Sequence, residues 1–66
     1  MKLYSGIVSS VLWDNTRYVV TFRDGREIEF YSDSNKQDVF DAIKENTLFV
    51  VGKGKKLVDV YRLKMY

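Results

Sequence analysis

The chain lacks the residue types that usually stabilise or activate very small proteins. Its 66 residues include no cysteine, no histidine and no proline. Disulfides and structural zinc sites, the two common staples of very small domains, are therefore excluded. A single domain of this length, residues 1–66, buries only roughly 60% of the surface that the unfolded chain exposes. We therefore expect part of the stability to come from self-association or from a partner.

The same absences argue against an enzyme. General acid–base catalysis most often uses histidine, and nucleophilic catalysis uses cysteine or a serine activated by a neighbouring base. The chain has five serines, and none has an evident activating residue nearby in the sequence. The closest carboxylate pair, Glu27 and Glu29, is expected on the solvent face of a hairpin, where nothing desolvates it. We predict no catalytic residues, no cofactor and no metal ligands.

What remains is typical of a folded, soluble protein. Hydrophobic residues make up 45% of the chain and charged residues 30%. The apolar stretch after Lys2 is interrupted by Gly6, Ser9 and Ser10, which is too broken for a signal peptide, and no run approaches the roughly 20 apolar residues of a membrane span. We expect a cytoplasmic protein with no membrane contact.

Turn residues divide the chain into five strand-like stretches and one helix, in the order β-β-β-α-β-β. The first three stretches are expected to form an antiparallel meander. In its second hairpin, a three-residue loop over 23–25 with a left-handed glycine pairs Val20 with Ile28 and Tyr18 with Phe30. This register places the apolar residues on one face of the hairpin. A register shifted by one residue would put polar and apolar side chains on the same face.

A helix is predicted over residues 35–45. Ser34 is the expected N-cap, with Gln37 completing a capping box, and Asn46 is the expected left-handed stop. An apolar stripe on this helix, suited to packing on a sheet, is formed by Val39, Phe40 and Ile43.

The first and last strands are apolar on both sides, which is more than one short helix can cover. In the first strand, one side carries Ile7, Val11 and Trp13, and the other carries Tyr4, Val8 and Leu12. Either the sheet curls into a half-open barrel, or a second apolar face meets another molecule. The predicted fold is a small α+β domain, with a twisted antiparallel sheet or half-open barrel of about five strands.

These observations favour a non-enzymatic protein-interaction module that forms a homodimer and acts as an inhibitor or adaptor by covering a partner protein's surface. A monomer with scattered exposed aromatic residues is the alternative. Trp13 is either a binding anchor or the end of a small core. The predicted apolar binding residues are Tyr4, Val8, Leu12, Trp13, Tyr61 and Leu63.

Basic residues near the end of the chain suggest a second hypothesis. An Sm/SH3-like small barrel would bind nucleic acid or another anionic ligand through the glycine-lysine loop and the strand after it. The predicted anion-binding residues are Lys53, Lys55, Lys56, Arg62 and Lys64. The alternative is that these cations keep the chain soluble and protect a sheet edge.

The middle of the chain is acidic: residues 24–45 carry seven acids against three bases. This surface either meets a basic partner, or simply solvates a hairpin and a helix. The candidate acidic residues are Glu27, Glu29, Asp38, Asp41 and Glu45. In size, lack of cysteine and order of hairpin, helix and strand, residues 17–65 resemble small phage-encoded inhibitors such as those that block uracil-DNA glycosylase. No motif carries this resemblance, and it assigns no residues.

Overall fold

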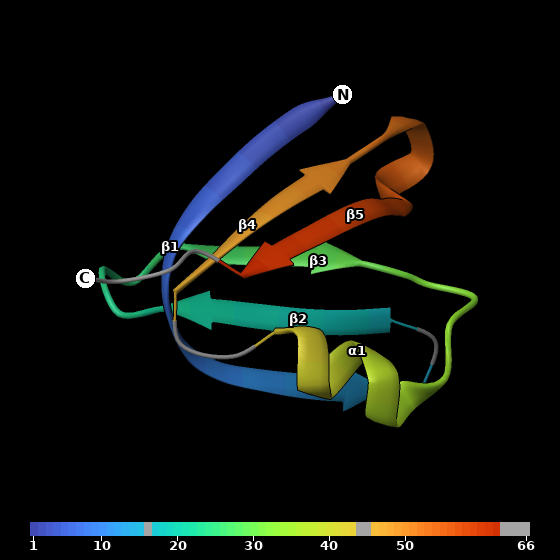
Figure 1. Cartoon of the computed structure of the whole chain (residues 1–66), viewed down its shortest axis with the longest axis horizontal. Coiled ribbons are helices and arrows are strands. Elements are labelled where there is room, and N and C mark those ends of the chain that lie inside the picture. Colours follow the sequence, from blue (N-terminus) through green and yellow to red (C-terminus); the bar gives the residue numbers. More distant parts are fainter. Residues whose placement is uncertain (16, 44–45, 63–66) are drawn as a thin grey trace.

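The computed structural model describes residues 1–15, 17–43 and 46–62, and shows a five-stranded antiparallel sheet with one helix (Figure 1). The spatial order of the strands is β3-β2-β1-β4-β5, and the sheet does not close into a barrel. This confirms a small α+β fold with an antiparallel sheet, and it argues against the closed barrel of the Sm/SH3-like hypothesis. The elements are β1 (Lys2–Asp14), β2 (Arg17–Phe22), β3 (Glu27–Phe30), α1 (Lys36–Ala42), β4 (Asn46–Val51), the 3-10 turn η1 (Lys53–Lys55) and β5 (Leu57–Arg62).

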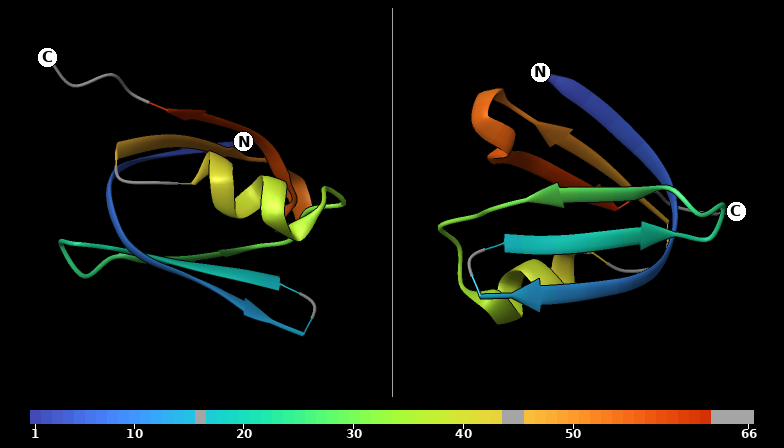
Figure 2. Two further views of the ribbon diagram at one scale, coloured as in Figure 1. Left: turned by 60° about the horizontal axis from the view of Figure 1, so that its bottom comes forward. Right: turned by 180° about the vertical axis from the view of Figure 1, so that it is seen from behind.

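The long first strand organises the molecule because it pairs with two different strands. Its first half, residues 2–7, pairs with β4, and its second half, residues 8–14, pairs with β2. Between these halves β1 bends, so the sheet folds over on itself in two layers (Figure 2). We call these the β4 layer (residues 2–7, β4 and β5) and the β2 layer (residues 8–14, β2 and β3).

A glycine and an arginine hold the bend in β1. Gly6 has a φ of 157°, and a Cβ placed there would lie 2.8 Å from Nη2 of Arg26 and 2.9 Å from the ring of Phe22. That Nη2 donates a hydrogen bond of 2.6 Å to the Ser5 carbonyl, and the guanidinium lies 4.7 Å from the centre of the Phe22 ring. The bend thus requires a residue without a side chain at position 6.

A bulge in β1 changes which of its apolar residues share a side. The register shifts between Val8 and Ser10, so the alternation of side chains changes phase there. As a result Val8 and Val11, which were expected on opposite sides, both pack against the core. The large apolar side chains of β1 that remain exposed are Leu3, Ile7, Leu12 and Trp13.

The core lies between the two layers and is rich in aromatic rings. Tyr18 stacks on Phe30 with 5.5 Å between ring centroids, and Phe22 and Phe49 meet edge to face at 5.9 Å. The helix α1 covers the open side of this sandwich (Figure 2). Its stripe behaves as predicted: Val39 and Ile43 are buried, and the half-buried ring of Phe40 meets Tyr18 edge to face.

The second hairpin confirms the predicted register. Val20 pairs with Ile28 and Tyr18 with Phe30. Gly25 has a φ of 93°, and the Phe22 amide donates to the Arg26 carbonyl at 2.8 Å, closing the three-residue loop.

The ends of the helix differ from the prediction. Asn35, and not Ser34, is the N-cap, because its side chain accepts a hydrogen bond of 2.8 Å from the Gln37 amide. The helix covers Lys36–Ala42 and is shorter than the predicted 35–45. Asn46 is not a helix stop but the first residue of β4, where it pairs with Ile7. Long-range strand pairing thus overrides the local preference of asparagine for a helix end.

Candidate interaction surfaces

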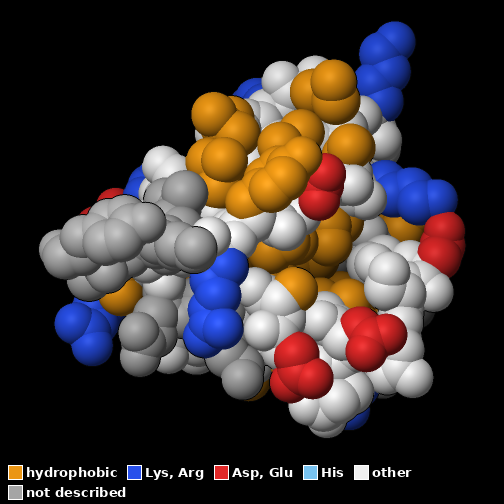
Figure 3. Space-filling view, viewed as in Figure 1, with side chains coloured by type: hydrophobic (Ala, Val, Ile, Leu, Met, Phe, Trp, Pro, Cys, Tyr) orange, Lys and Arg blue, Asp and Glu red, His pale blue; other side chains and the backbone are white. Residues whose placement is uncertain are grey.

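The outer side of the β4 layer carries a patch of apolar side chains. The pairing places Leu3 beside Val50, and Leu48 beside Tyr61, all on the side that faces away from the core. Ile7 continues the same side of β1. Figure 3 shows hydrophobic side chains gathered on this face, over β4 and β5. We call Leu3, Ile7, Leu48, Val50 and Tyr61 the outer apolar face.

The members of this face are accessible to another molecule. Leu3 is 65% exposed, Ile7 40% and Tyr61 49%, and Leu48 and Val50 on the more central strand are half-buried. One carboxylate borders the patch: the Tyr61 hydroxyl donates a hydrogen bond of 2.6 Å to Asp59. That hydrogen bond and the negative charge of Asp59 raise the pKa of Tyr61 above its ordinary value.

The outer side of the β2 layer is polar instead. Arg17 forms an ion pair of 2.9 Å with Glu29 across the two strands β2 and β3. Leu12 on this side is 61% exposed and pairs with the half-buried Val19. The two layers therefore differ in chemistry: one outer side is mainly apolar, and the other mixes charged side chains with one apolar pair.

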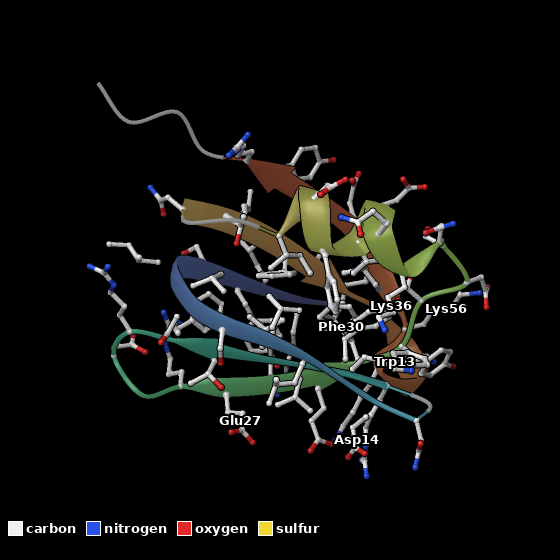
Figure 4. The ribbon with its side chains drawn as sticks, turned by 90° about the horizontal axis from the view of Figure 1, so that it is seen from below. Trp13, Asp14, Glu27, Phe30, Lys36 and Lys56 are labelled. Atoms are coloured by element: carbon white, nitrogen blue, oxygen red, sulfur yellow. The ribbon has the colours of Figure 1, made fainter. Side chains whose placement is uncertain are left out.

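The six predicted apolar binding residues do not come together on one surface. Tyr4 and Val8 pack against the core, and Leu12 lies on the polar side of the β2 layer. The Trp13 ring packs against Tyr18 at a tilt of 55°, with 4.7 Å between ring centroids, and stays 41% exposed at one end of the core (Figure 4). Of the set, Tyr61 belongs to the outer apolar face, and Leu63 lies outside the described residues.

Sequence reasoning missed the other four members of the outer apolar face. Leu3 and Val50 are neighbours only because β1 pairs with β4, and their separation along the chain gives no local signal for this. The alternation of buried Thr47, Phe49 and Val51 is present in the sequence and identifies the outward side of β4.

The predicted basic residues separate into two places. Lys53 and Lys55 belong to η1, where Gly54 and Lys55 have positive φ angles of 72° and 59°. Lys56 is held by an ion pair of 2.6 Å with Asp33, which raises the lysine pKa. Arg62 ends β5 at the opposite end of the strand from this turn, and Lys64 lies outside the described residues.

A lysine from the start of the chain joins the basic turn. Lys2 pairs with Val51 at the end of β4, next to η1. A shallow cavity of about 250 Å³ lies between them, and Tyr4 forms part of its wall. The lysines around it are Lys2, Lys53 and Lys55.

The predicted acidic surface also divides. Glu27 and Glu29 lie on β3, in the β2 layer, whereas Asp38 and Asp41 lie on α1. Asp41 accepts a hydrogen bond of 2.9 Å from Gln37 within the helix. Glu45 lies outside the described residues.

Residues 1–15, 17–43 and 46–62 contain neither a metal-binding cluster nor a membrane-spanning helix. Histidine, cysteine and acidic side chains do not gather there in a group of three or more that suits a metal ion. The single α-helix in that part of the chain is too short to cross a membrane. Comparison of the chain with protein-family models, curated proteins and solved structures found no match.

Proposed function

We propose that this chain is a non-enzymatic protein-interaction module that self-associates through its outer apolar face and acts as an inhibitor or adaptor by covering a protein surface. The observation that supports the proposal is the difference between the two outer sides. A monomer exposes single apolar residues at many points, whereas a gathered patch on one side of a sheet is typical of a contact surface.

The size of the face sets the expected strength of self-association. Three strands about 4.8 Å apart, with six residues of about 3.3 Å each, give a footprint of roughly 14 by 20 Å. This is smaller than the about 800 Å² per partner of a standard interface. We therefore expect a dimer that forms at micromolar concentrations and not an obligate one.

Sedimentation velocity tests this proposal over a range of micromolar concentrations. We expect a concentration-dependent shift from monomer to dimer for the unchanged chain. Leu3→Lys places a charge in the outer apolar face and is expected to shift the chain to monomer.

A matched control comes from the same strand. Leu12 is 61% exposed, close to the 65% of Leu3, but lies on the polar side of the β2 layer. Leu12→Lys is expected to leave the association unchanged. A chain that stays monomeric at every concentration, or a Leu12→Lys variant that dissociates as readily as Leu3→Lys, would contradict the proposal.

The second candidate function is anion or nucleic-acid binding at the basic turn. It is favoured by the position of Lys2, which brings a third lysine to the cavity beside Lys53 and Lys55. Titration with labelled single-stranded oligonucleotides at two salt concentrations distinguishes the two functions. Binding that weakens steeply with salt and with Lys53→Ala plus Lys55→Ala would promote this second candidate.

A further inference from the structure

The strand β3 forms one edge of the sheet. Within residues 1–15, 17–43 and 46–62, no backbone hydrogen bond reaches the free side of Glu27 or Glu29. The Phe22 amide bonds to the Arg26 carbonyl at 2.8 Å, and in an antiparallel ladder such pairs recur at every second residue. Ile28 and Phe30 therefore direct their backbone groups toward β2. Glu27 and Glu29 direct theirs away from the sheet.

The chain already uses this free side for one strand-like contact. The Tyr31 amide donates to the Lys55 carbonyl at 3.1 Å, and the Leu57 amide donates to the Tyr31 carbonyl at 3.0 Å. From Leu57 onward, β5 pairs with β4 and not with β3. Among the described residues, the edge of β3 from Glu27 to Phe30 is therefore unpaired, next to the parallel bridge between Tyr31 and Lys56.

A groove runs along this open edge. One cavity of about 390 Å³ has Tyr4, Ile28 and Val51 in its wall, and a second of about 410 Å³ has Phe30 and Tyr31. Both cavities are also lined by Glu29 and Lys55, so they adjoin. The groove has an apolar wall on the side of the core, where an added strand would place every second side chain.

The outer side of the groove carries the carboxylates of Glu27 and Glu29, and the cations Arg17 and Lys55 also line the groove. Figure 4 shows Glu27 pointing outward from β3, away from the interior where Phe30 lies. Glu29 points to the same outer side, where it meets Arg17. Among the described residues Glu27 forms no ion pair. A strand added to β3 would therefore place its outward side chains opposite two carboxylates.

Two features distinguish this edge from other candidates. On the other edge strand, β5, the Val60 amide donates to the Asp59 carboxylate at 2.9 Å and is unavailable to an incoming strand. Pairing of β3 with β3 of a second copy would set Glu27 and Glu29 against the same carboxylates, which is unfavourable.

We propose that β3 binds an extended segment of a partner protein by strand addition, and that this segment alternates basic and apolar residues. Its backbone bonds to the free amides and carbonyls of Glu27 and Glu29, and its basic side chains face their carboxylates. Its apolar side chains face Tyr4, Ile28 and Val51. Affinity comes from the backbone and selectivity from the alternating side chains. The site is separate from the outer apolar face and does not depend on self-association.

A fluorescein-labelled octapeptide of alternating lysine and valine is the probe. We expect it to bind the full chain, with amide chemical-shift changes in the NMR spectrum centred on Glu27 and Glu29. An octapeptide of alternating glutamate and valine is expected to bind severalfold more weakly, since its glutamates would lie opposite Glu27, which forms no ion pair among the described residues. Equal binding of both peptides, or shift changes confined to η1 or the outer apolar face, would overturn the proposal.

Two controls separate strand addition from simple attraction of charge. On the peptide, N-methylation of the amides that face β3 keeps every charge and removes the backbone donors, so binding should be lost. On the protein, Glu29→Pro removes an outward amide that β2 does not use, whereas Glu29→Gln keeps the amide and removes the charge. We expect Glu29→Gln to weaken binding severalfold and Glu29→Pro to abolish it.

The N-methylated peptide gives a decisive result even where the proline variant fails to fold, because it is tested on the unchanged chain. If it binds as tightly as the parent peptide, β3 is an acidic patch and not a strand-addition site. That result leaves the proposed self-association untouched, since the latter is measured without peptide.

Discussion

Thr47 lies at a fully buried position on β4, where its hydroxyl group has no hydrogen-bond partner among the described residues. Its side chain is 0% exposed. A buried hydroxyl without a partner costs about 1–3 kcal/mol, and valine has nearly the same shape. We expect Thr47→Val to raise the free energy of unfolding by about 1 kcal/mol, as measured by urea denaturation. Thr47→Ser keeps the hydroxyl and loses a methyl group, and is expected to lower it by a similar amount.

A second prediction concerns the pKa of Tyr61, whose hydroxyl donates a hydrogen bond to Asp59. Because the hydroxyl bonds to the carboxylate, the folded-state pKa of Tyr61 lies above its ordinary value of 10.0. The raised pKa means that the pair stabilises the fold below pH 10, and that this contribution is lost as the pH rises through the folded-state pKa. Asp59→Asn is expected to lower the Tyr61 pKa toward its ordinary value.

Ultraviolet absorbance titration of the tyrosines measures this change, and Tyr61→Phe identifies which midpoint belongs to Tyr61. An unchanged Tyr61 midpoint in Asp59→Asn would show that the hydrogen bond does not control its ionisation.

At the scale of elements, the bend in β1 depends on Gly6. An alanine there combines an unfavourable φ with a Cβ 2.9 Å from the buried ring of Phe22. We expect Gly6→Ala to lower the free energy of unfolding by about 2 kcal/mol. Gly25 provides the matched control, because its φ is 93° but no atom lies within 4 Å of an added Cβ. Gly25→Ala should lower the free energy of unfolding by only about 1 kcal/mol, because it adds the unfavourable φ without a steric contact. Equal losses in chemical denaturation would show that the contact with Phe22 is unimportant.

The elements also show which parts of the fold the sequence predicts. The register of β2 and β3 could be predicted because strict alternation and a glycine turn both act within a few residues. The bulge near Ser9 could not, since nothing in a run of serine and valine marks the position of an extra residue. The helix cap moved by one residue because serine and asparagine are nearly equivalent caps, and the tertiary context selects between them.

At the scale of the whole molecule, composition predicts that an apolar surface is left over, but not where it lies. The six predicted apolar binding residues include Tyr4 and Val8, which pack against the core, and Tyr61, which lies on the outer apolar face. That face also contains Leu3 and Leu48, on the outer side of the β4 layer. Its location depends on the long-range pairing of residues 2–7 with β4. The tests of self-association and of strand addition therefore probe two separate regions of the molecule.

The division of β1 between two layers has a consequence for the order of folding. The meander of β1, β2 and β3 needs contacts only between neighbours along the chain, and short loops close quickly. The β4 layer needs residues 2–7 to pair with β4, which follows the helix along the chain. Because one continuous strand belongs to both layers, we expect closure of the β4 layer to limit the folding rate. We also expect the two layers to unfold together in a single cooperative step.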